Sequence, residues 1–391
     1  MRLWSRDFVL TLAVTALIYP VFLGVQSTAS TVTLTYHWPP WTTGAQVAAV
    51  GGISIAMRPW AGRVLDRLGP QRPLVAALLA FLGVLVGMGS SRSIPAVIAL
   101  RVAQGVAWSL LNTATATIIQ LLAPPPRRGE ATGWYAVFGD LGMVVGPVLV
   151  AIVGVPQWFW WSAAVAAAAT GLALGVGSGR HPVPQPGARP VPRALWSRVW
   201  VPTVAQALTN TAFILVAAYT GSLAAARGWT WRIWPGVPVY TELFAGYGLA
   251  LLATRPILGR LSDRFGRPAV AIPALGLLTL ATVAEAHWAS ASRLWVIGAL
   301  VGVGYGGAQT ALLAWAGEAV PPALRGRAVG TYYAGFDAGI SATGVLSAIL
   351  VAHLGWPGVY SVCAAGPGMA ALLVSATSRT RHAVPPASEL L

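Results

Sequence analysis

The sequence predicts an all-α integral membrane protein whose twelve transmembrane helices form two pseudo-symmetric six-helix bundles. Composition, a series of long apolar runs and an internal repeat all indicate this fold class. Of the 391 residues, 56% are hydrophobic and 9% are charged, and the mean hydropathy is +0.68. Globular domains carry about 25% charged residues. The composition therefore excludes a disordered chain, a nucleic-acid-binding domain and most cytosolic enzymes, and favours a polytopic membrane protein.

Twelve apolar runs are long enough to cross a bilayer, whose hydrocarbon core of about 30 Å needs about 20 residues per helix. They fall approximately at 7–29, 43–62, 73–90, 94–121, 131–152, 157–177, 199–225, 238–258, 269–288, 294–317, 328–351 and 356–377. The first run is long, contains Tyr19 and Pro20, and is followed by eleven more, so we expect a retained span and not a signal peptide.

The basic residues report the orientation of the chain. All 25 are arginine, against ten acidic residues, and they lie in short clusters between the apolar runs. With a cytoplasmic N-terminus, twenty of them, including Arg58 and Arg255, lie on the cytoplasmic side. Four lie outside, and Arg101 falls within a span. This bias predicts that both termini are cytoplasmic. The lack of lysine suggests a bacterium with a biased genome, and we expect the protein in its inner membrane.

The segment from Ser178 to Arg198 contains five prolines and is expected to be an extended, semi-rigid cytoplasmic linker. It separates a predicted N-terminal bundle, residues 1–177, from a C-terminal bundle with a short cytoplasmic tail, residues 199–391. The single cysteine, Cys363, excludes an intramolecular disulfide and a CxxC metal pair. We expect neither a metal nor a cofactor.

The two halves contain the same pattern, RPxxGRxxDRxG, beginning at Arg58 and again at Arg255. The offset of 197 also carries Tyr135, Asp140 and Gly142 onto Tyr332, Asp337 and Gly339. Matches of Asp, Tyr and Arg at fixed spacing indicate a duplicated six-helix unit and not low complexity.

On these residues the chain resembles the major facilitator superfamily (MFS) across essentially its whole length. The segment 62–72, and more closely 259–267, is similar to that family's signature GxxxDRxGRR. Two further patterns are similar to RxxQG and to the GxxxGP of exporters, and they are formed by Arg101, Gln104, Gly105, Gly142, Gly146 and Pro147. The resemblance implies a secondary transporter, without enzyme activity, that alternates access by rocking its two halves.

Each signature segment is a candidate conformational latch. Its glycine permits close helix approach, its aspartate can accept backbone N–H groups at a helix start, and its arginines can reach carboxylates or lipid phosphate. The resemblance implies that this latch stabilises an outward-open state; the alternative is that the arginines only set topology. The candidates are Gly62, Arg63, Asp66, Arg67, Gly69, Gly259, Arg260, Asp263, Arg264 and Gly266.

Ionisable residues inside a bilayer are costly and are functional candidates by default. Asp140 lies about 14 Å into its predicted span, near the midplane, and Asp337 is its repeat equivalent. Arg101 and Glu242 complete the proton-coupling candidates. For the aspartates the alternative is a structural carboxyl at a tight helix crossing, for Arg101 a structural ion pair, and for Glu242 solvation by lipid headgroups.

Polar and aromatic residues at helical spacing mark a candidate substrate cavity, because a lipid-facing surface would not carry them. The resemblance implies that spans one, four, seven and ten line this cavity; the alternative is hydrogen bonding between helices. The candidates are Tyr19, Gln26, Gln104, Trp108, Asn112, Gln206, Asn210, Phe213, Tyr305 and Gln309.

These features favour a monomeric, proton-coupled antiporter that exports a small, partly hydrophobic molecule. Its partners would be that substrate, protons and the lipid bilayer, with no nucleic acid. The alternative is a proton symporter or facilitator that takes up a sugar-like or organic-acid solute through Arg101 and Glu242. Two other classes are weaker: an intramembrane protease, since Asp140 lacks the GxGD pattern, and a sensor, since no soluble domain follows. The sequence has no Walker loop, so we do not expect ATP to be the energy source.

Overall fold

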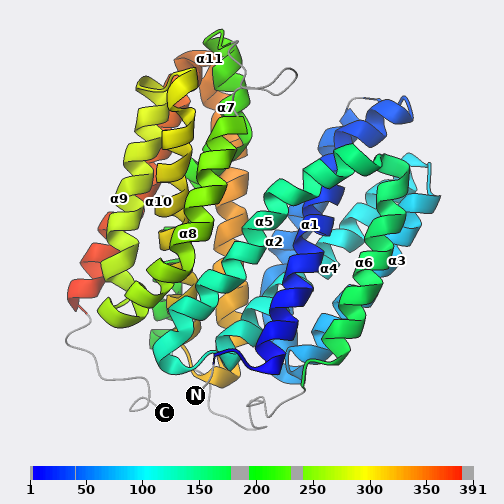
Figure 1. The fold of residues 1–391 in the computed structure, drawn as a ribbon, viewed down its shortest axis with the longest axis horizontal. Coiled ribbons are helices and arrows are strands. Elements are labelled where there is room, and N and C mark those ends of the chain that lie inside the picture. Colours follow the sequence, from blue (N-terminus) through cyan, green and yellow to red (C-terminus); the bar gives the residue numbers. More distant parts are fainter. Residues whose placement is uncertain (1–2, 40, 178–192, 230–240, 381–391) are drawn as a thin grey trace. The chain divides into compact units, whose positions relative to one another are not determined.

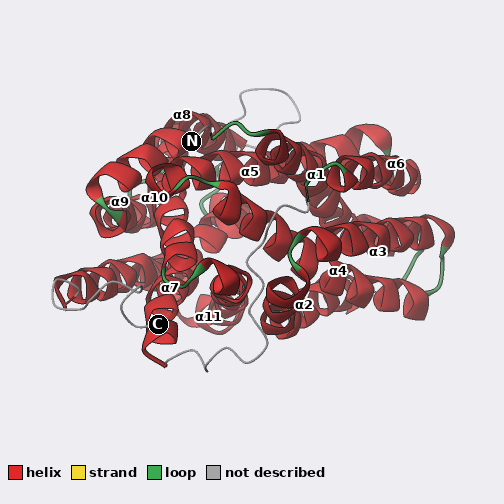
Figure 2. Cartoon of the chain, turned by 90° about the horizontal axis from the view of Figure 1, so that it is seen from below, coloured by secondary structure: helices red, strands yellow, loops and turns green. Residues whose placement is uncertain are grey.

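The computed structural model describes residues 3–39, 41–177, 193–229 and 241–380, and every regular element in these ranges is a helix (Figures 1 and 2). Most of the predicted linker (178–192) and the end of the predicted tail (381–391) lie outside the described residues. The helices are α1 Arg6–Thr35, α2 Trp41–Leu68, α3 Gln71–Ser90, α4 Ile94–Leu122, α5 Arg128–Val153, α6 Val155–Leu174, α7 Arg193–Ala226, α8 Thr241–Phe265, α9 Arg267–His287, α10 Leu294–Glu318 and α11 Arg325–Thr380.

Gly355 interrupts α11 with a φ of 63°, so this element comprises two helical segments. A positive φ is accessible to glycine at little cost. The described part of the chain therefore contains twelve α-helical segments, one for each predicted span. Eight of these are long and apolar enough to cross a membrane by length and composition.

The predicted spans end at residues 62 and 258, so the two signature segments were expected to lie beyond the helices, but both are helical for most of their length. Helix α2 continues to Leu68 and α8 continues to Phe265. Charged residues do not end a helix once it has left the hydrocarbon region. The backbone turns only at Gly69 (φ 72°) and Gly266 (φ 94°), where glycine adopts the left-handed conformation common just after a helix C-terminus.

The described chain divides into two compact units. Unit 1 comprises the described residues of 1–124, 134–190 and 321–333, and unit 2 those of 125–133, 191–320 and 334–391. The start of α5 therefore belongs to unit 2, and the start of α11 belongs to unit 1. In these two short segments the units differ from the halves expected from the sequence.

Small residues allow the helices of each unit to approach closely. In unit 1, a Cβ at Gly146 of α5 would lie 2.5 Å from the Pro20 carbonyl oxygen and 2.7 Å from the Gly24 nitrogen of α1. In unit 2, a Cβ at Gly302 of α10 would lie 2.6 Å from the Tyr247 carbonyl oxygen of α8. Lipid tails are as apolar as the helices, so close packing of this kind supplies much of the association energy in membranes.

Candidate functional site

A buried arginine of unit 1 lies among the predicted cavity residues. Arg58 of α2 is 1% exposed. Its Nη1 donates to Asn112 Oδ1 at 2.8 Å and to Thr113 Oγ1 at 3.3 Å, both on α4, and its guanidinium lies 4.9 Å from the ring centre of Tyr333. The Asn112 carboxamide in turn donates from Nδ2 to the Tyr19 hydroxyl of α1. We call Arg58, Asn112, Thr113 and Tyr19 the Arg58 cluster.

Hydroxyl groups extend this cluster towards α5. The Tyr19 hydroxyl lies 2.7 Å from that of Tyr135, which lies 3.1 Å from Thr115 Oγ1. Asp140 is half-buried on the same helix. It lies between two glycines that pack against α1: a Cβ at Gly139 would lie 2.9 Å from the Tyr19 ring, and one at Gly142 would lie 2.8 Å from the Tyr19 backbone. Asp140 thus lies at a tight crossing of α1 and α5.

Two aromatic rings form an apolar surface beside the Arg58 cluster. Phe22 of α1 stacks on Trp108 of α4, with ring centres 3.6 Å apart and planes 6° apart. Tyr19 meets the same indole edge-on at 4.9 Å. Tyr19 therefore contacts both the polar side chain of Asn112 and the aromatic ring of Trp108.

Unit 2 repeats this arrangement. Arg255 of α8 is fully buried and donates from Nη2 to Gln309 Oε1 of α10, and Gln309 Nε2 donates to the Tyr305 hydroxyl at 3.1 Å. The guanidinium lies 5.9 Å from the Tyr305 ring centre. Phe213 of α7 stacks on Tyr305 with ring centres 3.6 Å apart and planes 8° apart. We call Arg255, Gln309 and Tyr305 the Arg255 cluster.

The positions of Arg58 and Arg255 correct their placement among the arginines that lie between the apolar runs. Both are buried within their helices and bonded to carboxamides that were predicted as cavity residues. The repeat offset contained the missing signal, because 197 relates Arg58 to Arg255 and also Asn112 to Gln309. The count of arginines between apolar runs treated Arg58 and Arg255 only as markers of topology and so did not use this correspondence.

The other cavity candidates of α7 bond within unit 2. Gln206 Nε2 donates to Asn210 Oδ1 at 2.9 Å, and Asn210 Nδ2 donates to the Phe336 carbonyl oxygen of α11 at 2.8 Å. Both side chains are buried. Asp337, the repeat equivalent of Asp140, follows directly and is half-buried. Its own carbonyl accepts the Ser341 hydroxyl at 3.1 Å.

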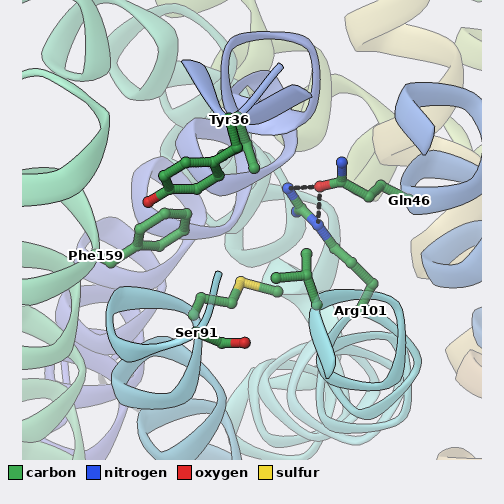
Figure 3. Close-up of a pocket in the computed structure, with 8 residues that line it drawn as sticks. Tyr36, Gln46, Ser91, Arg101 and Phe159 are labelled. Atoms are coloured by element: carbon green, nitrogen blue, oxygen red, sulfur yellow. Dashed lines mark hydrogen bonds between the residues drawn. The ribbon is translucent and has the colours of Figure 1, made fainter. Parts of the chain in front are cut away.

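The buried guanidinium of Arg101, on α4, bonds to residues of α1 and α2 in unit 1, and Figure 3 shows its bonds to Gln46. Its Nη1 donates to the Val25 carbonyl oxygen at 2.9 Å, and its Nε and Nη2 both reach Gln46 Oε1, at 3.3 and 3.2 Å. The remaining acceptors are Gln26, Gln104 and Thr28. None of these acceptors is a carboxylate, so among the described residues Arg101 joins helices through neutral oxygens and forms no ion pair.

A small cavity lies beside this network. It is lined by Arg101, Gln46, Tyr36, Ser91, Phe159 and three apolar side chains, and its volume is about 10 Å³. That is enough for one water-sized particle. Figure 3 shows this cavity. Gln26 and Gln104, which were predicted to line the substrate cavity, both accept hydrogen bonds from the Arg101 guanidinium.

Glu242 lies in the first turn of α8 and is 5% exposed. Its Oε1 has no hydrogen-bond partner among the described residues. Burial of this side chain within unit 2 does not favour the alternative given for Glu242, solvation by lipid headgroups.

The start of α11 packs against the first signature segment. The backbone amides of Gly326 and Arg327 hydrogen-bond to the Asp66 carboxylate, and Arg327 Nε forms an ion pair with Asp66 Oδ2 at 3.1 Å. Gly62 makes this approach possible, because a Cβ there would lie 2.7 Å from the Arg327 Cα. Burial raises the pKa of Asp66 to about 7, against the opposing effects of Arg327 and the two amides.

The second signature segment receives the start of α5 in the same way. Asp263 Oδ1 accepts the Gly129 N–H at 2.7 Å, and Oδ2 accepts the Glu130 N–H at 3.0 Å. A carboxylate at this position satisfies N–H groups that have no partner within the helix and interacts favourably with the helix dipole. Gly259 is again required, since a Cβ there would overlap the Gly129 carbonyl.

Ion pairs surround the second contact more densely than the first. Arg260 bonds to Glu130 Oε1 at 2.8 Å and Arg127 to Glu130 Oε2 at 2.7 Å. Burial opposes ionisation of Glu130, but these two hydrogen bonds outweigh it and hold its pKa below the usual range. Arg267 pairs with both Asp263, at 2.7 Å, and Glu318, at 2.6 Å. The two copies of the motif are therefore electrostatically unequal.

Of the four predicted latch arginines, only Arg260 forms an ion pair among the described residues. Arg63, Arg67 and Arg264 are exposed, and Arg63 bonds back to the Pro59 carbonyl at 3.2 Å. Arg327, Arg267 and Glu130 were missed. They lie at helix starts distant in sequence from the motif, so its spacing did not reveal them.

Comparison with known proteins bears on the family and the fold. The sequence matches the profile of the Major Facilitator Superfamily over residues 8–242 and 235–390. The MFS-type transporter YhhS of Escherichia coli K12 is 28% identical over 351 residues, covering 85% of this chain and 82% of that protein. YhhS of Salmonella typhimurium is 30% identical over 191 residues, or 47% and 44% of the two chains. The human organic anion transporter MFSD10 (TETRAN) shares the fold, with a TM-score of 0.73, 16% identity, and coverage of 94% of this chain and 97% of that one.

Proposed function

Because the chain belongs to the Major Facilitator Superfamily and is therefore a membrane transporter, we propose that it is a proton-coupled antiporter that exports a small, partly hydrophobic molecule. The observation that carries this proposal is the pairing, in each unit, of a stacked aromatic surface with a buried polar cluster. Ligand sites are largely apolar, with a few polar groups that fix orientation. Rocking of the two halves would open the substrate site to one side of the membrane and then to the other.

Asp140 is the proposed proton carrier, with Asp337 as its counterpart in the second copy. Asp140 lies one and a half turns beyond Tyr135, whose hydroxyl connects to Tyr19 and so to the Arg58 cluster. A carboxyl at this position can change protonation state while substrate occupies the neighbouring aromatic surface. Arg101 and Glu242 retain a proposed secondary part in coupling, Glu242 because it is a buried carboxyl in the first turn of α8.

The signature contacts are the proposed latch. Asp66 with the start of α11, and Asp263 with the start of α5, each join a signature segment to a helix start in the other half of the sequence. Breaking both contacts releases these helix starts, as rocking requires.

The proposed location is the inner membrane of a bacterium, with both termini cytoplasmic and the protein monomeric. Removing Arg58 and Arg255 from the cytoplasmic set leaves eighteen arginines against four, so the charge bias that supports this orientation persists. Labelling of single cysteines placed at Arg92 and Arg379, in a Cys363→Ala background, tests it. Only the Arg92 position should react with an impermeant thiol reagent in whole cells.

Proton movement in proteoliposomes tests the function. The lumen carries a pH dye, and hydrophobic cations, sugars and organic acids are added outside. An antiporter makes the lumen more alkaline as substrate enters, and Asp140→Asn abolishes this signal. Asp7→Asn is the matched control, because Asp7 lies in the first turn of α1 and bonds to the Gly177 N–H at 3.0 Å. Substrate flux with no proton movement, unchanged in Asp140→Asn, would refute the coupling.

Import of an acidic solute is the second candidate function. The buried guanidinium groups of Arg58 and Arg255 favour it, because a guanidinium group attracts an acidic solute. The same assay separates the two, since a symporter acidifies the lumen when its substrate is added outside.

A further inference from the structure

Three helices of unit 2 meet at a buried carboxyl group that the proposed mechanism does not use. Glu285 lies in the last turn of α9 and is fully buried. Its Oε1 lies 2.5 Å from the Thr220 hydroxyl of α7, which lies 3.3 Å from the Tyr360 hydroxyl of α11. The Tyr360 hydroxyl also lies 3.3 Å from the Leu215 carbonyl oxygen of α7. We call Glu285, Thr220 and Tyr360 the Glu285 junction.

The contacts of Thr220 indicate that Glu285 carries a proton. A threonine hydroxyl has one hydrogen to donate, and a backbone carbonyl can only accept. Thr220 Oγ1 lies 2.6 Å from the Val216 carbonyl oxygen. If Thr220 gives its hydrogen to that carbonyl, the 2.5 Å contact with Glu285 needs a hydrogen from the carboxyl group. Both short contacts are therefore hydrogen bonds only when Glu285 is protonated.

The surroundings of Glu285 do not suit a carboxylate. Its Oε2 has no hydrogen-bond partner among the described residues. Arg227, just after α7, is near enough to interact with a charge on Glu285, but its guanidinium donates to the carbonyl oxygens of Ala286 and Ala289. A buried charge without a bonded partner is costly, and such a group usually becomes neutral instead. Burial and the count of hydrogens thus lead to the same protonation state.

A proton on Glu285 has a short path to water. Helix α9 begins directly after the second signature segment and ends at exposed His287, two residues beyond Glu285. A rise of 1.5 Å per residue places Glu285 about 3 Å along the axis from that end, which is the outer end in the proposed orientation. A carboxylate formed there would have Arg227 as a nearby counter-ion.

Other ionisable groups lie near this end of the helices around Glu285. Those that interact with its carboxyl group belong to Tyr360 and Arg227. His287 Nε2 bonds to the Ser361 hydroxyl at 2.8 Å. The full set at this end of unit 2 is Tyr219 on α7, Arg227 after it, Glu242 on α8, His287 on α9, Arg293 before α10, and Tyr360 and Cys363 on α11.

We propose that Glu285 is a proton-binding site, which holds a proton on Oε1 in the conformation described here and releases it to water at the outer end of unit 2 when Thr220 and Tyr360 move away. Release leaves a carboxylate on Glu285 and passes the proton to water. The site adds a second carboxyl to the proposed proton coupling, and its part in transport rests on that proposed function.

Infrared difference spectroscopy of the full-length protein in nanodiscs tests the proposal. A protonated carboxylic acid has a C=O stretch separate from carboxylate bands, and an ordinary glutamate, with a pKa of about 4.3, is ionised at about pH 7. The wild-type spectrum minus that of Glu285→Gln removes the contributions of His287 and Glu242. It should contain an acid band at about pH 7 that is lost by about pH 10. A carboxylate band at pH 7, or an acid band that persists at pH 10, would overturn the proposal.

A pair of threonine variants tests the bond itself. Thr220→Val keeps nearly the same shape but removes the acceptor of the Glu285 proton, so the acid band should shift in frequency. Thr209→Val is the matched control, because Thr209 is also buried on α7 and bonds to its own helix, at the Ala205 carbonyl oxygen. This variant should leave the band unchanged. The same spectrum in both variants would show that Thr220 does not accept the proton.

The proteoliposome assay separates this inference from the proposed function. Glutamine can donate to Thr220 as the acid does but cannot release a proton, so Glu285→Gln should fold and lose most of the substrate-driven change in lumenal pH. If the acid band titrates but no substrate moves protons in the wild type, the site stands and the coupling fails. If proton movement is normal in Glu285→Gln and absent in Asp140→Asn, the coupling stands and Glu285 has no part in it.

Discussion

Asp263 of α8 accepts the backbone N–H of Gly129, at the start of α5, over 2.7 Å, although 134 positions separate the two residues in the chain. Asp66 holds the start of α11 in the corresponding manner. A motif defined by its spacing along one helix thus acts on a helix start elsewhere, and both contacts can be tested by substitution.

Replacing Asp263 with Ala should loosen the first turn of α5. The substitution leaves the Gly129 and Glu130 N–H groups without their acceptor, and loss of such a helix cap costs about 1 kcal/mol. Hydrogen exchange of a peptide covering residues 128–132 should accelerate by about fivefold. Arg63→Gln, a change at an exposed residue of the first signature segment, should leave that exchange unchanged. Unaltered exchange in Asp263→Ala would refute the capping role.

Asp66 should make thermal stability depend on pH. Burial raises its pKa in the fold to about 7 from an ordinary value of 3.8. Its contribution to stability is therefore largest below about pH 4, declines as the pH rises, and is lost above about pH 7. Asp66→Asn, which stays neutral, should unfold at a higher temperature than the wild type at pH 8, and this difference should be clearly smaller at pH 5. A larger difference at pH 5 would contradict the raised pKa.

Gly146→Leu should weaken the crossing of α1 and α5. Its side chain would meet the Pro20 carbonyl oxygen and the Gly24 backbone, which cannot move aside as a side chain can. Overpacking of this kind typically costs 1–3 kcal/mol, so the apparent Tm in detergent should fall by several degrees. At Gly83 of α3 a Cβ would meet nothing within 4 Å, and Gly83→Ala is expected to stabilise by about 0.4–1 kcal/mol. A similar loss in both variants would rule out the crossing as the cause.

Arg101→Lys should be nearly as damaging as Arg101→Gln. A lysine has three donors from one nitrogen and cannot reproduce the planar contacts to α1 and α2. Loss of hydrogen bonds to a charged group costs about 1.5–3 kcal/mol each, so both variants should lower the Tm markedly, while Arg92→Gln should not. Full retention of stability in Arg101→Lys would show that charge, and not geometry, is what this position requires.

The helices were largely predictable, and the contacts of the site were predictable only in part. Twelve apolar runs locate twelve helical segments because length and hydropathy are local properties. The offset of 197 also pairs Trp108 with Tyr305 and Asn112 with Gln309, which is a property of the sequence alone. It did not reveal that Gln26 and Gln104 serve Arg101, because bonding between helices depends on how each helix is rotated.

The errors came from treating charge as a marker of loops. Arg58 and Arg255 were assigned to the cytoplasmic side because they begin a charged motif, whereas α2 and α8 carry that motif as helix and turn these two residues inward. The partners Arg327 and Glu130 were not predicted, for a related reason. No spacing rule connects a signature segment to a helix start in the opposite half.

The exchanged helix starts impose an order on biosynthesis. Asp66 emerges from the ribosome 260 residues before Gly326, one of the amides that it accepts in the finished fold. At about 5–20 residues per second, this carboxylate waits roughly 13–52 s while eight further helices are made. During that interval the Asp66 carboxylate at the end of α2 lacks the amides that it accepts in the finished fold, and the contact forms only when the penultimate helical segment has been made.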